Sequence, residues 1–106
     1  MEVKKLIFPE PVDGYLKNIF QKQEEGVAIQ CGSVVLGKGA ELPSKTMEFH
    51  EISYLISGKL KVSTKEGGEK IMNVGDLIYL TKEELRKTIT LEESKILFFL
   101  FKKLSS

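Results

Sequence analysis

The sequence has no tryptophan, one cysteine, one histidine and three prolines among its 106 residues. A single cysteine excludes a disulfide within the chain, and we expect Cys31 to be a buried core residue, because no nearby cation or helix start favours a reactive thiol. The single histidine, His50, stands beside Glu51 ahead of an apolar strand. This pair raises the question of a metal site.

Long apolar runs and an excess of one charge are also absent. No apolar run approaches the roughly 20 residues that span a membrane, and the segment MEVKKLIFPEP lacks the apolar stretch of a secretory signal. Sixteen Lys and Arg against 15 Asp and Glu give a net charge of +1, which gives no reason to expect nucleic acid as a partner. We therefore expect a cytoplasmic protein with neither nucleic acid nor a membrane as partner.

Short apolar runs are abundant, and turn residues separate them at intervals of about ten residues. A chain of 106 residues that is 42% hydrophobic can form one domain with a real core. We therefore predict a single all-β domain over residues 1–106. The predicted strands cover residues 26–37, 51–58, 59–64, 70–74, 77–80 and 95–101, with a glycine-containing hairpin turn at 65–70 and a Gly-Asp turn at 75–76.

Two segments are ambiguous. Residues 13–25 have apolar residues at helical spacing, but they also fit a strand with Leu16 and Phe20 on one face, and we favour the strand because its neighbours are strands. Residues 81–89 have the charge pattern of a helical turn, with Thr81 as the cap and Glu84 three residues later. We expect a loop that contains one such turn.

Some strands are apolar on both faces. In the segment KILFFLF, residues 95–101, both alternating sets after Lys95 are apolar, whereas a sheet with one wet face alternates. Either a second subunit covers the outer face, or the segment is a central strand under a loop. Because so short a chain has few loops to spare, we favour a homodimer.

The order of these segments resembles the cupin superfamily. The stretches GKGAELP, HEISYLISGKLKV, GGEKIMNVGDLIYL and SKILFFLF follow the two cupin motifs. Gly39, Glu51 and Gly58 match the first motif, and Gly75 with Asp76 begins the second. The resemblance implies a double-stranded β-helix, or jelly-roll barrel, with a cupin-like core at about residues 27–101 and an N-terminal strand segment at 1–26.

The resemblance also implies where metal ligands usually lie. Of the four positions only Glu51 has a ligating side chain here. The other three positions fall on Lys45 and Met47, or on Ser44 and Thr46, and on Arg86 or Lys87. Since lysine and arginine repel a divalent ion, we expect no metal and no cofactor.

His50 does not replace the missing ligands. Neighbouring residues on a strand point to opposite faces, so His50 points outward if Glu51 points inward. We expect it on the surface or in a subunit interface. A metal-dependent enzyme with atypical ligands such as His50 is an alternative, and it requires a β-bulge at this point.

Glu51 is the centre of the predicted site. An inward carboxylate is costly unless it is paired, and Lys45, Arg86 and Lys87 are possible partners. The simplest interpretation is a structural ion pair. The functional one is a pocket in which Glu51, as candidate catalytic residue, binds a small polar or anionic ligand together with Lys45, Arg86 and Tyr54, although Tyr54 also fits a core or interface aromatic.

Within the superfamily, FHEISYLISGKLKV and GDLIYLTK are similar to the cupin domain of the ethanolamine-utilisation Q family. The resemblance implies an accessory role in ethanolamine utilisation, in the cytoplasm or at a bacterial microcompartment. It implies an acetate kinase-like enzyme as the alternative, although the chain has no G-x-x-x-x-G-K-[ST] phosphate loop. Whether the protein is an enzyme stays open at this point.

Overall fold

The protein is an all-β barrel, as the sequence predicts. The computed structural model describes residues 1–45 and 48–104, without the side chains of residues 43–47. Over these residues it contains a short 3-10 turn and seven strands: η1 (Pro11–Asp13), β1 (Leu16–Glu24), β2 (Val27–Leu36), β3 (Glu41–Lys45), β4 (His50–Thr64), β5 (Gly68–Met72), β6 (Leu77–Leu80) and β7 (Arg86–Lys103). No helix in the described part of the chain has the length and apolar character needed to cross a membrane.

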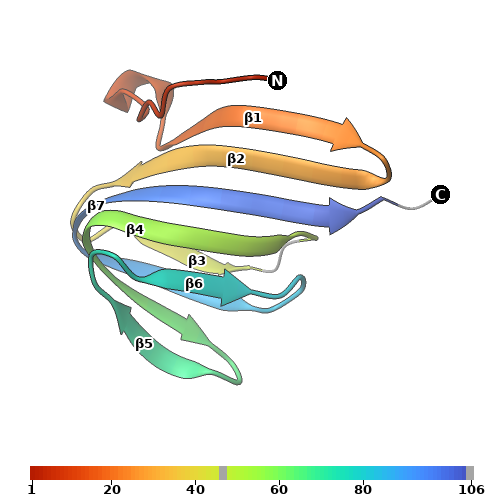
Figure 1. The fold of residues 1–106 in the computed structure, drawn as a ribbon. Coiled ribbons are helices and arrows are strands. Elements are labelled where there is room, and N and C mark those ends of the chain that lie inside the picture. Colours follow the sequence, from red (N-terminus) through yellow and green to blue (C-terminus); the bar gives the residue numbers. More distant parts are fainter. Residues whose placement is uncertain (46–47, 105–106) are drawn as a thin grey trace.

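Two long strands, β4 and β7, belong to both layers of the barrel (Figure 1). The first half of β4 and the second half of β7 pair with each other and lie between β6 and β2, with β1 at the edge. The second half of β4 and the first half of β7 pair again, between β5 and β3. All these pairings are antiparallel. The two layers are therefore one continuous sheet folded over a common core.

The bend in β4 depends on Gly58. The register between β4 and β7 shifts three times between Leu55 and Leu60, and Gly58 lies at this irregularity with φ of +98°. A Cβ on Gly58 would collide with Ser94 and with the carbonyl of Glu93. The Ser94 hydroxyl accepts from Lys59 N at 3.1 Å and donates to the Glu92 carbonyl at 2.7 Å. A hydrogen-bonded corner thus fixes the fold of the sheet.

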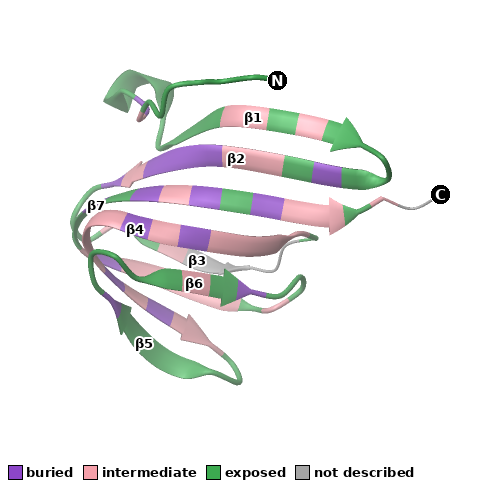
Figure 2. Cartoon of the chain, in the orientation of Figure 1, coloured by how far each residue is buried: buried purple, intermediate pink, exposed green. Residues whose placement is uncertain are grey.

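The core lies between the two layers and takes one alternating set of side chains from each strand. Figure 2 shows buried residues alternating with less buried ones along β7. The buried apolar cluster consists of Val34, Leu36, Leu55, Leu60, Val62, Met72, Ile96, Phe98 and Leu100. We call the layer formed by β1, β2, the second half of β7, the first half of β4 and β6 the front layer, and the alternation leaves its other face outside the core.

The structure also resolves the first ambiguous segment. Residues 16–24 form strand β1, as favoured, but Leu16 and Phe20 do not share a face. Asn18 pairs with Gly32 and Phe20 pairs with Cys31, so Ile19 is an extra residue in a bulge. One inserted residue reverses which face the following side chains occupy, and the prediction of a common face was therefore wrong.

The second ambiguous segment is a turn followed directly by a strand. The amide and hydroxyl of Thr81 both donate to the Glu84 carboxylate, at 3.2 and 3.3 Å, and the Glu84 amide donates to the Thr81 carbonyl at 3.2 Å. The segment is therefore a hydrogen-bonded β-turn and the expected helical turn was wrong, because Glu83 has a left-handed φ of +66° that a helix does not contain. Strand β7 already begins at Arg86, so the predicted loop is shorter than expected.

We predict that Gly58→Ala destabilises the protein strongly. The left-handed backbone and the collision with the Ser94 corner together should lower the free energy of unfolding by about 3 kcal/mol or more. Gly37→Ala is the control, because a Cβ there meets nothing within 4 Å and its φ is not left-handed. Urea denaturation followed by circular dichroism measures both. Equal stability of the two variants would contradict this role for Gly58.

Candidate functional site

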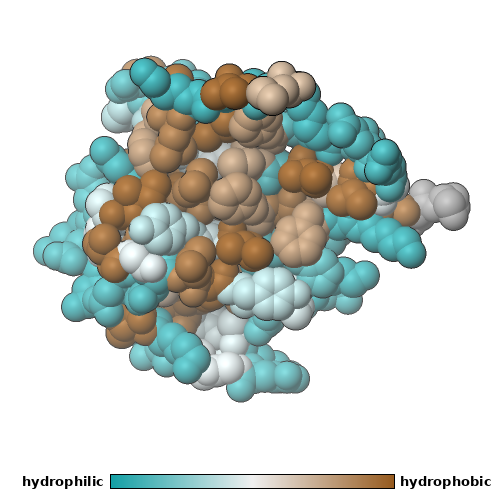
Figure 3. All heavy atoms as spheres, viewed as in Figure 1, coloured by the Kyte–Doolittle hydropathy of each residue, from teal (hydrophilic) through white to brown (hydrophobic). Residues whose placement is uncertain are grey.

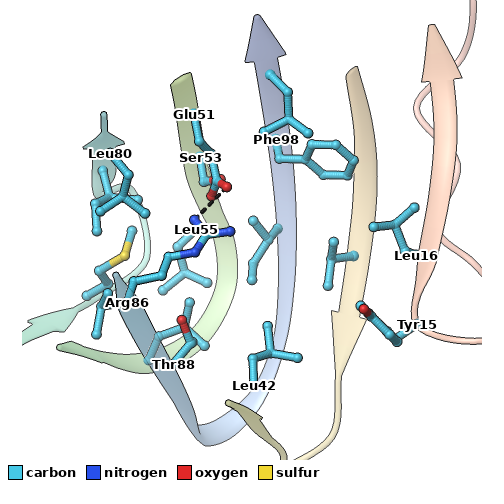
Figure 4. Close-up of a pocket in the computed structure, with 17 residues that line it drawn as sticks. Tyr15, Leu16, Leu42, Glu51, Ser53, Leu55, Leu80, Arg86, Thr88 and Phe98 are labelled. Carbon is cyan, nitrogen blue, oxygen red and sulfur yellow. Dashed lines mark hydrogen bonds and ion pairs between the residues drawn. The ribbon is translucent and has the colours of Figure 1, made fainter. Parts of the chain in front are cut away.

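A cavity of about 130 Å³ lies between the two layers of the barrel (Figure 4). Most of its lining is aliphatic, supplied by residues such as Leu55 and Ile96, with Phe98 adding an aromatic ring. Apart from Tyr15, the polar lining residues are Glu51, Ser53, Arg86 and Thr88. The polar groups therefore form a small cluster on an otherwise apolar wall.

An ion pair forms the centre of this cluster. Arg86 Nη1 lies 2.5 Å from Glu51 Oε1, and the Ser53 hydroxyl donates to Glu51 Oε2 at 2.7 Å. The two charged side chains are only 16% and 13% exposed. Both oxygens of the carboxylate are therefore engaged, and Figure 4 shows Arg86 reaching across the cavity toward Glu51.

Strand geometry explains why these residues meet. Glu51, Ser53 and Leu55 alternate along β4 and face inward, as predicted. Glu51 pairs with Leu80 on one side and Leu100 on the other, so its neighbours in the sheet offer no compensating charge. The charge comes instead from Arg86, the first residue of β7, which lies in the other layer.

The remaining predicted site residues do not join the cluster in the described structure. Lys45 is paired in the sheet with Arg86, but its side chain lies outside the described part. Lys87 turns away and forms an exposed ion pair with Glu41 at 2.7 Å. Tyr54 lies on the opposite face of β4 and does not line the cavity, contrary to its predicted place in the pocket, because it alternates with Ser53 and Leu55.

Sequence reasoning missed Thr88 and the apolar character of the cavity. Thr88 follows Arg86 by two positions on β7, so a period of two counted from Arg86 would have found it. Thr90 continues the same face, is 1% exposed, and its Oγ1 has no hydrogen-bond partner among the described residues. The apolar walls come from all seven strands and from Tyr15 just before β1, which no local motif connects.

The residues at the usual cupin metal position do not fit a divalent ion. One carboxylate, a hydroxyl and a guanidinium are present, and the guanidinium repels a cation. Over residues 1–45 and 48–104, no group of three or more His, Cys, Asp or Glu side chains is arranged to hold a metal. The described side chains at this position therefore do not support binding of a divalent ion.

The two other candidate groups lie away from the cavity. His50 Nδ1 is 3.2 Å from the Tyr79 hydroxyl, and its ring stacks on Tyr79 and Phe101 on the outer face. Cys31 is partly buried, and burial raises the pKa of its thiol, which disfavours the reactive thiolate at neutral pH. Both lie on the outer face of the sheet, so the expectation that Cys31 is a buried core residue was wrong.

No family profile matches the chain, and no curated protein matches it. Solved structures do match in fold. The Cnp3 cupin domain of Schizosaccharomyces pombe superposes with a TM-score of 0.69 at 18% identity, over 83% of this chain and 63% of that one. A cupin superfamily protein of Desulfitobacterium hafniense gives 0.63 at 10% identity, over 99% and 84%.

A third solved structure bears on the resemblance found in the sequence. A putative ethanolamine utilisation protein Q of Salmonella typhimurium superposes with a TM-score of 0.63 at 21% identity, over 80% of this chain and 66% of that chain. At such identities structural likeness establishes the fold and leaves the chemistry to be argued from the site. The protein has the jelly-roll fold of the cupins, and a putative ethanolamine utilisation protein Q is among the solved structures that share this fold.

Proposed function

We propose that the protein binds a small molecule between its two layers, one with an apolar body and a single polar group. The observation that carries this proposal is a mostly apolar cavity with one hydrogen-bonded ion pair on its wall. The apolar body would lie against Leu55, Ile96 and Phe98. The polar group would exchange hydrogen bonds with Arg86, Ser53 or Thr88.

The cavity limits the size of the ligand. A cavity of about 150 Å³ lined by aliphatic and aromatic side chains binds benzene in another protein. The volume of about 130 Å³ here therefore suits a molecule of roughly six to ten non-hydrogen atoms. Sites for drug-sized ligands occupy roughly 300–1,000 Å³, so the cavity gives no support to a nucleotide and hence none to the acetate kinase alternative.

The charge of the site favours a neutral ligand. Among the side chains that the structure describes, Glu51 and Arg86 are the charged ones that line the cavity, and they neutralise each other. An anion that took Arg86 for itself would leave the Glu51 carboxylate buried without its partner, at a cost of about 3–5 kcal/mol. Of the two ligand types expected from the sequence, polar and anionic, the geometry therefore favours the neutral polar one.

The biological role we propose is that of a ligand-binding accessory protein of ethanolamine utilisation in the cytoplasm. It is supported by the motif resemblance and by the structural likeness to a putative ethanolamine utilisation protein. Acid–base catalysis on Glu51 is a second candidate, favoured by one observation: the carboxylate lies on the wall where a ligand's polar group would sit. In that case Glu51 would accept a proton from the ligand, and the Arg86 guanidinium would stabilise the negative charge that then develops on the ligand.

A matched pair of probes tests the proposal. Benzyl alcohol and benzoate have the same ring and nearly the same size, but they differ in charge. We expect benzyl alcohol to raise the melting temperature and to shift the amide resonances of residues that line the cavity, and benzoate to do so more weakly. Stabilisation by benzoate equal to or greater than that by benzyl alcohol would contradict the preference for a neutral ligand.

Filling the cavity should abolish binding. Thr88→Phe places a ring in the space between the layers, whereas Lys87→Phe adds the same ring at the next position on the other face of β7. We expect the first variant to lose the benzyl alcohol response and the second to keep it, as measured by the same resonance shifts. Retained binding in folded Thr88→Phe would place the ligand elsewhere.

Removing one partner of the ion pair should cost more than removing both. Arg86→Met leaves the Glu51 carboxylate buried and should lower the free energy of unfolding by about 3 kcal/mol. Glu51→Leu combined with Arg86→Met should recover most of that loss, because neither charge then remains. Urea denaturation of the single and double variants measures the difference. A double variant less stable than Arg86→Met would contradict the argument.

A further inference from the structure

One side of the cavity reaches the surface of the molecule. Tyr15 and Leu16 line the cavity and are 48% and 40% exposed, whereas the other lining residues that the structure describes are buried or half-buried. Both lie on the side of the cavity opposite Arg86 (Figure 4), where β1 begins. The cavity therefore opens at this edge of the barrel, away from the ion pair.

Strand pairing explains the opening. Among the described strands, β1 pairs with β2 alone and β3 pairs with β7 alone, so no ladder joins the two layers along this edge. Tyr15 and Leu16 line the cavity from the front layer, and Leu42 of β3 lines it from the other layer. We call the gap framed by Tyr15, Leu16 and Leu42 the seam.

A mostly aliphatic path leads across the strands to the seam. In the front layer, sheet register places one inward residue from each of β4, β7, β2 and β1 in a single row, and all four line the cavity: Leu55, Ile96, Val34 and Leu16. The matching row in the other layer is Val62, Thr88 and Leu42. From β4, which carries Glu51, to β1 the distance is three strand spacings, or about 14 Å. These walls suit an alkyl chain that runs across the strands.

The end of the cavity at the ion pair is closed. Beyond Glu51 and Arg86 lies a crevice of only about 10 Å³, which both residues also line. Such a volume holds about one water molecule. Its lining also includes Thr81 and Glu84, whose side chains hydrogen-bond to each other. In the part of the chain that the structure describes, a ligand therefore has room to extend toward the seam rather than past the ion pair.

We infer that the ligand is a neutral amphiphile whose unbranched alkyl chain leaves the cavity through the seam. The inference rests on the proposed function, because the polar head of the molecule is the group proposed to bind at Arg86, Ser53 or Thr88. The volume of about 130 Å³ then limits only the enclosed part of the ligand to roughly six to ten non-hydrogen atoms. Further carbons of the chain lie against Tyr15 and Leu16, and the apolar surface buried there adds to the affinity.

The outer face of the front layer is the competing place for an alkyl chain. Apolar side chains gather on this face (Figure 3), and Leu77, which pairs with Tyr54 there, is 67% exposed. The sheet itself separates this face from the cavity, so a chain bound there would not reach the ion pair. Leu16→Asp and Leu77→Asp therefore distinguish the two places.

A series of 1-alkanols tests the inference. Hexanol, octanol, decanol and dodecanol have the same head group and differ in chain length. Because a fully buried methylene strengthens binding about fourfold, we expect each added carbon to lower the Kd about twofold or more through dodecanol. A cavity closed at the seam would instead bind most tightly near octanol. The amide resonances of Tyr15 and Leu16 should shift further with dodecanol than with hexanol.

Two matched variants locate the chain. Leu16→Asp places a charge in its path, so we expect the Kd for dodecanol to rise about tenfold or more and the Kd for hexanol to rise much less. Tyr15→Asp is a second variant at the seam, with the same expected result. Leu77→Asp is the control on the outer face and should leave both Kd values as they are in the wild type.

The outcomes separate this inference from the proposed function. Hexanol binding with no further gain up to dodecanol would overturn the inference and leave the proposed function intact. Failure of every alkanol to bind would overturn both. Loss of dodecanol binding in Leu77→Asp, with binding retained in Leu16→Asp and Tyr15→Asp, would also overturn the inference, in favour of the outer face.

Discussion

The structure depends on β4 and β7, because each of these long strands takes part in both layers of the barrel. Each strand pairs with the other in both layers, so the layers cannot separate without breaking the longest ladder in the molecule. The sharp change of register near Gly58, held by the Ser94 hydrogen bonds, lets one strand serve both layers. The inward-facing side chains from both halves of β4 and β7 therefore lie in the same core.

The Glu51–Arg86 pair is a direct product of that arrangement. Glu51 comes from the first half of β4 and Arg86 from the first half of β7, which belong to different layers. A carboxylate between leucines would be unfavourable alone, and the guanidinium from the opposite layer compensates it. The same pair places a charged, hydrogen-bonded group on the wall of an otherwise mostly apolar cavity.

Sequence reasoning succeeded where a local pattern determines the result. Alternation along β4 placed Glu51, Ser53 and Leu55 inward, and the turn signals placed the ends of β2, β5 and β6 within two residues. They missed β3 and placed the start of β7 nine residues late. Sequence reasoning failed at Phe20, because a bulge of one residue has no sequence signature that marks it. It also failed at Tyr54, which was included in the site on residue type although its parity with Ser53 excluded it.

The composition of the cavity was beyond local patterns for a different reason. Its walls combine side chains from strands far apart in the chain, and whether Arg86 or Lys87 faces inward depends on where the turn after β6 ends and β7 begins. A shift of one residue in the start of β7 would turn Lys87 inward and Arg86 outward. Sequence alone left that choice open, and only the pairing of β7 with β4 decided it.

The pairing of β4 with β7 has a consequence for how the chain reaches this structure. His50 pairs with Phe101 and Thr64 with Arg86, so even the nearest contacts of this ladder close a long loop. Loop closure must precede the contacts that reward it, and β proteins dominated by such pairings fold in milliseconds to seconds rather than microseconds. Only the β1–β2 and β4–β5 hairpins can form early, so the search for the central ladder sets the pace of folding.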